Sequence, residues 1–431
     1  MSSKRPPEPG TEKRPAGTRH HLYTNAPLPG SGQADAADGN GSVSTEEDEL
    51  ALYREKRERY QRRKRARRRF AAVVLLLAVL TGLVWLNVGT LAPQSVADRT
   101  ENLLDGMGWG KSLFPVSFNQ GTFQAAVPVG NDLGVLTDTT FLLYSQNGRC
   151  LAARPQGMTD PVAVSCGSKA LLYDRSGKQF RVETRFGEPF TASANEPITT
   201  AAGAQNGSFA IVTQSEDYLS ELKVYDNAYK NIFQWDCAQG RILCAALNPA
   251  GNKLAAVVVG ARGGALFSDI YFFRIGSAKP FAVKAYDGEL LYSIRYRSDG
   301  TVSAVGESKT VFLKDGRQTA VYDYGSRELL KSSNAEPLIL VFGGVNGQSQ
   351  AVSLSASGKL LGQAGLPGTP VAVSAGGGYA AFISGGRLYA SPQSLKGLKT
   401  VSAANGVLGA VTMQGKAFLF GAQFAQRRAL G

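Results

Sequence analysis

The longest apolar run of the chain predicts a transmembrane helix. No charged residue occurs from Phe70 to Ala97, and residues 70–86 are almost entirely apolar. A helix of about 20 such residues crosses about 30 Å of hydrocarbon. We therefore predict a transmembrane helix over residues 70–92. A cleaved signal peptide is the rival interpretation, but it would have a shorter apolar core behind a short basic segment, whereas 69 residues precede this run.

Polar segments on both sides of this run divide the first part of the chain further. Residues 1–44 are rich in Pro, Gly, Ser, Ala and Asp and lack an apolar run, so we predict a disordered cytoplasmic tail. Ser44 and Glu47 have the spacing of a capping box, which predicts a charged, basic juxtamembrane helix over residues 45–69. Residues 93–112 are expected to form a stalk.

Lys and Arg residues are distributed unequally about the predicted span. Eleven basic residues and two glutamates lie between Arg54 and Arg69, whereas the first basic residue beyond the span is Arg99. Because basic residues favour the cytoplasmic end of a span, we predict a cytoplasmic N-terminus and an extracytoplasmic remainder. The basic residues nearest the span are expected to contact anionic lipids. They are Arg62, Arg63, Lys64, Arg65, Arg67, Arg68 and Arg69.

The pattern changes to short strands from Leu113 onward. Runs of β-branched and aromatic residues alternate with turns of Gly, Asn and Asp, which indicates an all-β region. A repeat emerges, in which an apolar strand leads through a small turn to a second strand of small and apolar residues. Its turns lie at Gly130, Gly167, Gly207, Gly251, Gly300, Pro337, Gly377 and Gly415.

The spacing of these turns predicts a β-propeller over residues 113–425. Successive turns are 37 to 49 residues apart, close to the roughly 40–45 residues of a four-stranded blade. Eight turns predict eight blades, with seven as the alternative, and a pair of β-sandwiches is the structural rival. A second apolar run after most turns, such as Phe141–Tyr144, predicts third strands.

The last repeat is too short to form a complete blade. The chain ends about ten residues after Phe420, so the fourth strand of that blade is missing there. We expect it to come from the segment Leu113–Phe118, which precedes the first repeat. Such closure would remove the open sheet edges that otherwise promote aggregation.

Composition restricts the chemistry available to the exported region. Both histidines, His20 and His21, lie in the predicted tail, which excludes the usual Ser-His-Asp sites and zinc sites from the propeller. The carboxylate pairs Glu216/Asp217 and Asp287/Glu289 fit solvated loops. We find no phosphate-binding loop and no calcium-loop spacing. We therefore predict no catalytic, metal or cofactor site, and no enzyme activity.

The four cysteines are predicted to be free and mostly buried. Cys150 and Cys237 fall in predicted outer strands, and Cys166 and Cys244 fall in the inner strands that follow them. Such positions are too far apart for a bridge that requires Cα atoms within about 7 Å. A disulfide remains the alternative, because an extracytoplasmic location permits one.

The net charge of the chain is weaker evidence for an anionic partner than its total suggests. The chain carries +13, which alone would suggest an anionic partner such as nucleic acid or a membrane surface. Residues 54–69 contribute +9, and the exported residues 98–431 contribute +7. Membrane topology already accounts for the basic run, so we do not expect a nucleic-acid partner.

Taken together, the basic flank at Arg54–Arg69, the span at Phe70–Leu86 and the repeats from Leu113 resemble an uncharacterised bacterial family. Its members are single-pass, membrane-anchored proteins with an exported WD-like or quinoprotein-like propeller. The lone Trp235-Asp236 dipeptide is not repeated, so the resemblance is at the level of the blade and implies no cofactor or activity.

Two functions of different classes fit this organisation. The preferred hypothesis is a non-catalytic platform that binds a protein or an anionic envelope polymer through the faces of the propeller. The alternative is an enzyme or a small-ligand receptor that uses the central channel, which predicts polar or charged side chains converging near one face. A third hypothesis is that the propeller signals to a cytosolic partner through residues 1–69.

Overall fold

The computed structural model describes residues 74–75, 112–402 and 405–430. Val74 and Leu75 are helical. Within these ranges, no helix is both long enough and apolar enough to cross a membrane. The rest of the predicted span at 70–92, together with the tail, the basic helix and residues 93–111 of the stalk, lies outside the described residues. The membrane anchor therefore stays a prediction.

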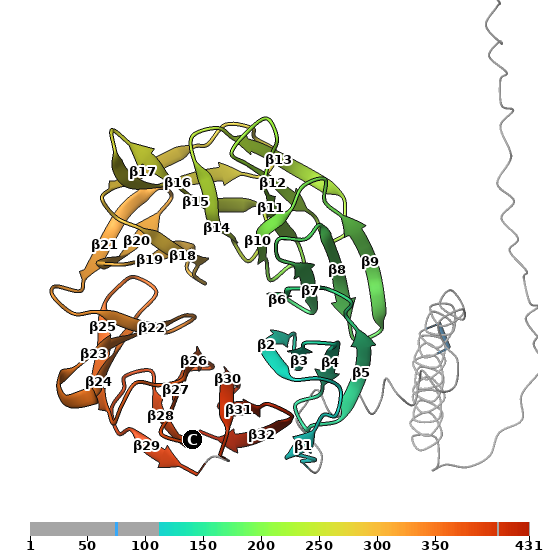
Figure 1. The fold of residues 1–431 in the computed structure, drawn as a ribbon, viewed down its shortest axis with the longest axis vertical. Coiled ribbons are helices and arrows are strands. Elements are labelled where there is room, and N and C mark those ends of the chain that lie inside the picture. Colours follow the sequence, from blue (N-terminus) through green and yellow to red (C-terminus); the bar gives the residue numbers. More distant parts are fainter. Residues whose placement is uncertain (1–73, 76–111, 403–404, 431) are drawn as a thin grey trace, which may run out of the picture. The chain divides into compact units, whose positions relative to one another are not determined.

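The described part of the chain from Val116 onward forms an eight-bladed β-propeller, as predicted (Figure 1). Each blade is a four-stranded antiparallel sheet, and the first strand of each blade borders the central channel. From the channel outward, the strands of blades one to four are β2 (Phe123–Val129), β3 (Asp132–Thr137), β4 (Thr140–Tyr144) and β5 (Cys150–Pro155); β6 (Pro161–Cys166), β7 (Lys169–Asp174), β8 (Gln179–Thr184) and β9 (Gly187–Ser193); β10 (Ile198–Gly203), β11 (Phe209–Thr213), β12 (Ser220–Tyr225) and β13 (Asn231–Cys237); and β14 (Arg241–Leu247), β15 (Lys253–Arg262), β16 (Ala265–Arg274) and β17 (Ala282–Asp287).

Blades five to eight repeat this arrangement, and a short 3-10 helix, η2 (Val345–Gly347), lies inside blade six. Their strands are β18 (Leu291–Tyr296), β19 (Thr301–Gly306), β20 (Lys309–Lys314) and β21 (Arg317–Asp323); β22 (Leu329–Asn334), β23 (Leu338–Gly343), β24 (Ser349–Leu354) and β25 (Leu360–Leu366); β26 (Ala372–Gly376), β27 (Tyr379–Ser384), β28 (Arg387–Pro392) and β29 (Lys399–Val401); and β30 (Val407–Met413), β31 (Lys416–Gly421), β32 (Phe424–Ala429) and β1 (Val116–Ser117).

Blade eight combines the two ends of the propeller. Its first three strands come from the C-terminal end of the chain, and β1 supplies the outer strand. β1 pairs antiparallel with β32, with Val116 opposite Ala425 and Ser117 opposite Phe424. The predicted closure by the segment Leu113–Phe118 is therefore confirmed.

All eight predicted turns lie between the first and second strands of a blade. Glycine is needed at several of them because the backbone takes a positive φ, which costs a residue with a Cβ atom. The values are +92° at Gly207 and +80° at Gly300. The predicted third strand Phe141–Tyr144 lies in β4, the third strand of blade one.

The hydrophobic core is a ring of eight clusters, one between each pair of neighbouring blades. Successive side chains of a strand point to opposite faces of its sheet. In β11, Phe209 and Ile211 pack toward blade two, whereas Ala210 and Val212 pack toward blade four. Both faces of the strand are thus buried, which explains its continuous apolar sequence.

The antiparallel order of the strands gives the propeller two different faces. The turns between strands one and two, and between strands three and four, lie on one face, here named the turn face. Backbone hydrogen bonds join such turns of neighbouring blades, from Gly130 N to Gly167 O (2.6 Å) and from Asn206 N to Pro249 O (3.0 Å). The opposite face, named the link face, carries the connections between blades. The described chain enters at the turn face, where Leu113 N donates to Asn147 O.

Candidate functional site

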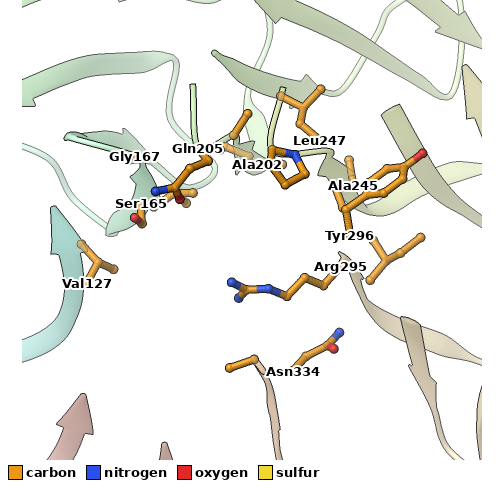
Figure 2. A pocket seen from close by; sticks show the side chains of 18 of the residues that line it. Val127, Ser165, Gly167, Ala202, Gln205, Ala245, Leu247, Arg295, Tyr296 and Asn334 are labelled. Atoms are coloured by element: carbon orange, nitrogen blue, oxygen red, sulfur yellow. The ribbon is translucent and has the colours of Figure 1, made fainter. Parts of the chain in front are cut away.

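The central channel widens near the turn face into a cavity of about 600 Å³ (Figure 2). The inner strands of blades one to six form its wall, together with residues of the turns that follow them. Most of the lining side chains are small. They include Ala163, Ser165, Ala201, Ala202, Ala245 and Ala246.

Crowding near the axis of the propeller explains these small residues. The inner strands of neighbouring blades approach each other closely there. A Cβ atom at Gly203 would lie 2.1 Å from the carbonyl oxygen of Ser165, and one at Gly167 would lie 2.1 Å from that of Gln205. Backbone contacts of this kind tolerate no side chain, so the wall of the cavity is built largely from Ala, Ser and Gly.

Arg295 is the single charged residue among those that line this cavity. It lies on β18, and Figure 2 shows its side chain reaching from the wall into the open space. Within the described part of the chain it makes neither a hydrogen bond nor an ion pair. The surrounding protein partly removes water from the guanidinium, which lowers the pKa of Arg295, and the charge of Glu336 opposes this effect.

A second arginine, Arg297, is fully buried behind the cavity wall. Its Nε donates to Ser303 Oγ (2.9 Å), one terminal nitrogen donates to Asn334 Oδ1 (2.9 Å), and the other donates to the carbonyl of Ala335. Burial and the charge of Arg295 lower the pKa of Arg297 to about 10, so the side chain stays protonated at neutral pH. Its contacts are all with neutral acceptors.

The same network joins blade five to blade six. Asn334, on β22, donates from Nδ2 to Ser293 Oγ on β18 (3.0 Å). Beside it, both carboxylate oxygens of Glu336 accept hydrogen bonds from Ser298, one from the backbone nitrogen (2.6 Å) and one from the hydroxyl (2.8 Å). This site was not predicted from the sequence. The signal that could have revealed the site is a charged residue at a position that is small in other repeats. Arg295 lies five residues before the turn glycine Gly300, and the equivalent residues of two other repeats are Ala202 and Ala246.

At the link face, a β-bulge lies near the start of six inner strands. The register of β2, β10, β14, β18, β22 and β30 shifts by one residue there. A bulge leaves one residue without a partner and turns its side chain away from the regular ladder. The residues left out are Gln124, Thr199, Leu243, Tyr292, Leu330 and Leu408.

Exposed apolar side chains gather around this end of the channel. Leu243, Tyr292 and Leu408 are bulge residues, and Val371 directly precedes the inner strand β26. These four residues, named the mouth ring, are between 38% and 56% exposed. Val371 and Leu408 also line a cavity of about 300 Å³, in which Lys331 is the single charged lining residue.

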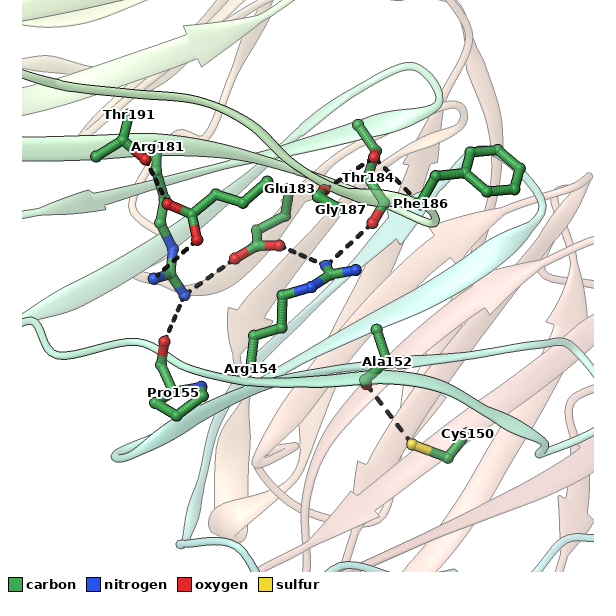
Figure 3. A network of polar contacts seen from close by, with 11 residues as sticks. Cys150, Ala152, Arg154, Pro155, Arg181, Glu183, Thr184, Phe186, Gly187 and Thr191 are labelled. Carbon is green, nitrogen blue, oxygen red and sulfur yellow. Dashed lines mark hydrogen bonds and ion pairs between the residues drawn. The ribbon is translucent and has the colours of Figure 1, made fainter. Parts of the chain in front are cut away.

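A buried carboxylate network joins blade one to blade two (Figure 3). Glu183 is fully buried and forms ion pairs with Arg154 (Nη1–Oε2, 2.6 Å) and Arg181 (Nη2–Oε1, 2.9 Å). Arg181 also donates to the carbonyl oxygen of Pro155 in blade one (2.8 Å). Both oxygens of the carboxylate face arginines, so this network has the geometry of a clamp between blades.

The carboxylate pairs Glu216/Asp217 and Asp287/Glu289 differ in their exposure to solvent. Glu216 and Asp217 are exposed in the loop between β11 and β12, and Asp287 is exposed beside Arg262 (3.1 Å). The interpretation of Glu289 as a solvated loop residue is wrong. Glu289 is buried, and its carboxylate accepts hydrogen bonds from the backbone nitrogen (3.0 Å) and the hydroxyl of Ser308.

The predicted lipid-contact residues lie outside the described chain, whereas the cysteines lie within it. The basic residues from Arg62 to Arg69 lie outside it, so the lipid-contact prediction stays a prediction. All four cysteines lie within it and are free thiols: Cys150 is exposed, Cys166 and Cys237 are buried, and Cys244 is intermediate. Burial raises the pKa of both Cys166 and Cys244 to about 12.

Thiol labelling of the folded protein is expected to be selective for Cys150. At pH 8 a thiol with a pKa of about 12 is deprotonated in about one molecule in ten thousand, and the thiolate is the reactive species. N-ethylmaleimide should therefore modify Cys150 first and Cys166 and Cys244 only after denaturation. Mass spectrometry of the denatured, unreduced chain should count four labels. Two labels would reveal a disulfide and contradict the expectation.

No group of three or more His, Cys, Asp or Glu residues that could hold a metal ion occurs in the part of the chain that the structure describes. The fold and the channel thus define a class: an eight-bladed β-propeller that is closed by its N-terminal strand and has a cationic group inside its channel.

Residues 119–330, which include blades one to five, match the sequence model of DUF5711, a family of unknown function. No curated protein matches the chain.

Among solved structures, the C-terminal WD40 domain of Sif2 is similar. It is 9% identical, with a TM-score of 0.53, and the match covers 75% of this chain and 100% of that domain. BamB from Moraxella catarrhalis (10% identity, TM-score 0.46, coverage of 73% and 97%) and a chain of a mitotic checkpoint complex (9%, 0.44, 74% and 96%) are more distant in structure. The likeness to the Sif2 domain supports the WD-like propeller implied by the resemblance as a fold, whereas the anchor and the bacterial origin stay predictions.

Proposed function

We propose that the protein is a single-pass, membrane-anchored β-propeller on the extracytoplasmic side of the membrane, and that it binds a partner without catalysing a reaction. The apolar run at 70–92 and the basic residues before it support the anchor and its orientation. The partner is a protein or an anionic envelope polymer, and the net charge of +7 on residues 98–431 suits the polymer.

The mouth ring is the observation that carries the proposal of a protein partner. Apolar side chains that gather on the surface of a soluble protein often mark a binding site. Leu243, Tyr292, Val371 and Leu408 are exposed around one opening of the channel. Tyr218, in the link-face loop between β11 and β12, and Leu266, near the link-face start of β16, are further exposed apolar residues. The described chain enters at the turn face, so the link face is the one directed away from that entry.

Several observations support a non-catalytic role. Residues 22–431 contain no histidine, so the commonest general base of enzymes is missing from the whole propeller. The buried carboxylates are engaged structurally: Glu183 pairs with two arginines, and Glu289 accepts hydrogen bonds from Ser308. Neither of them lines the cavities of the channel. The alternative of an enzyme in that channel has no such group to carry acid–base catalysis.

Site-specific photo-crosslinking tests the platform. A benzophenone amino acid at Tyr292, in the mouth ring, should give an adduct of one defined mass in cells that express the full chain. The same probe at Val283, which is similarly exposed on the outer strand β17, should give none. A double Leu243→Ser and Leu408→Ser variant should reduce the adduct at 292 several-fold. Equal adducts from both probe positions, or no adduct from either, would contradict the proposal.

Membrane attachment and orientation are tested separately. The full chain should remain in the membrane pellet after washing with alkaline carbonate. A membrane-impermeant maleimide added to intact, wall-stripped cells should label Cys150, which is exposed in the fold. Labelling that requires lysis of the cells would place the propeller in the cytosol, and release by carbonate would show that residues 70–92 do not anchor the chain.

A further inference from the structure

The charged residues that line the two described cavities of the central channel have one sign. Arg295 is the single charged residue that lines the larger cavity, and Lys331 is the single one that lines the cavity at the link face. No carboxylate lines either of them. A narrow passage with low-dielectric walls concentrates the field of such charges and raises the local concentration of ions of opposite sign.

The potential at Arg295 is reinforced from behind the wall. Arg297, two residues further along the chain, is buried, protonated and bonded to neutral acceptors. Glu336 is the acidic group whose charge acts on both arginines, and its two oxygens already accept hydrogen bonds from Ser298. The charge of Asp299 also acts on Arg297. Within the described chain, the guanidinium of Arg295, which faces the cavity, makes no hydrogen bond or ion pair and carries only the distant influence of Glu336.

We propose that the larger cavity is a binding site for a small molecule that carries a phosphate or carboxylate group, which Arg295 holds with its guanidinium. The planar fork of an arginine matches two oxygens of such a group, and charge-assisted pairs of this kind are about twice as strong as neutral hydrogen bonds. This inference does not rest on the mouth ring or on the membrane anchor.

The rest of the cavity suits a small polar molecule. Its volume of about 600 Å³ falls within the range of about 300–1,000 Å³ that is typical of ligand sites. Ser165, Gln205 and Ser333 add hydrogen-bonding side chains to the lining, and the alanines of the wall leave space around the guanidinium. Because Arg295 makes no contact that holds the fold together, its loss should affect the ligand more than the folding.

Titration calorimetry of the purified full chain tests the site. The probes are inorganic phosphate, glycerol 3-phosphate and citrate, with choline as a cationic control. The variants are Arg295→Gln, Arg295→Lys and Arg317→Gln, the last of which removes an exposed arginine from the outer strand β21. Thermal unfolding without ligand verifies that each variant is folded.

The wild-type chain should bind at least one of the three anions and should not bind choline. Arg295→Gln should weaken binding at least about tenfold, Arg295→Lys should weaken it less, and Arg317→Gln should leave it unchanged. Tighter binding of the two phosphates would assign a phosphorylated ligand, and tighter binding of citrate would assign a carboxylic acid. Failure of all three anions to bind, or equal losses in Arg295→Gln and Arg317→Gln, would overturn the proposal.

Discussion

Replacement of Phe118 by alanine is expected to lower the free energy of unfolding by about 3–5 kcal/mol, the usual cost of removing a buried phenylalanine. Phe118 directly follows β1, is 3% exposed and belongs to the cluster between blades one and eight. Its backbone nitrogen also donates to Gln423 O (3.0 Å). The cavity left by the ring would weaken the contact that closes the propeller. Urea unfolding of the full chain, followed by tryptophan fluorescence, measures the loss.

Phe186 provides the matched control for this prediction. It is 79% exposed at the hairpin between β8 and β9. Phe186→Ala removes the same atoms from a position without packing, so the free energy of unfolding should change by less than about 0.5 kcal/mol. If both variants lost the same stability, closure by the N-terminal strand would contribute nothing special to the fold.

Replacement of Arg297 by leucine is expected to cost about 3 kcal/mol of stability or more. The substitution removes the donors to Ser303 Oγ and to the carbonyl of Ala335. It also removes one of the two donors to Asn334 Oδ1, which keeps its hydrogen bond from Ser303 Oγ (2.8 Å). A buried acceptor without a partner costs about 1–3 kcal/mol. The substitution also removes the desolvation cost of a buried charge, and this effect offsets part of the loss of stability. The midpoint of urea unfolding measures the sum of these effects.

Arg295 provides the control that distinguishes the loss of the Arg297 hydrogen bonds from a general effect of removing a positive charge. It carries the same side chain two residues away but makes no hydrogen bond or ion pair within the described chain. Arg295→Leu should therefore leave the free energy of unfolding within about 0.5 kcal/mol of the wild-type value. A neutral or stabilising Arg297→Leu substitution, such as some buried charges allow, would show that the network between blades five and six does not hold them together.

The architecture of the propeller could be predicted because its turns are local features. Gly207 and Gly300 occupy positions where the backbone requires a positive φ, and such glycines recur at this turn in every blade except the sixth, which has Pro337 there. The closing strand could be predicted from what the last repeat lacks. By contrast, alternation of apolar and polar residues could not locate the strands, because β11 and its equivalents bury both faces against neighbouring blades.

The site was harder to predict because it depends on contacts between blades. Arg297 directly follows the inner strand β18, whereas Asn334 ends the next inner strand, β22, and nothing near either residue in the sequence specifies which side chains of two blades meet. The bulges that place Leu243 and Tyr292 at the mouth of the channel are likewise shifts of register between strands, without a local signature. The carboxylate of Glu289 is bonded to Ser308, which lies 19 residues further along the chain, beyond β18 and β19.

The pairing of β1 with β32 also sets an order of events during synthesis. β1, the first strand of the propeller to leave the ribosome, has as its partner β32, the last strand of the propeller, because Val116 lies opposite Ala425. Until the end of the chain emerges, blades one to seven can form, but β1 remains without its neighbour and blade eight remains open. A chain that ends prematurely would leave sheet edges exposed and prone to aggregation. The propeller can therefore close only after β32 has been synthesised.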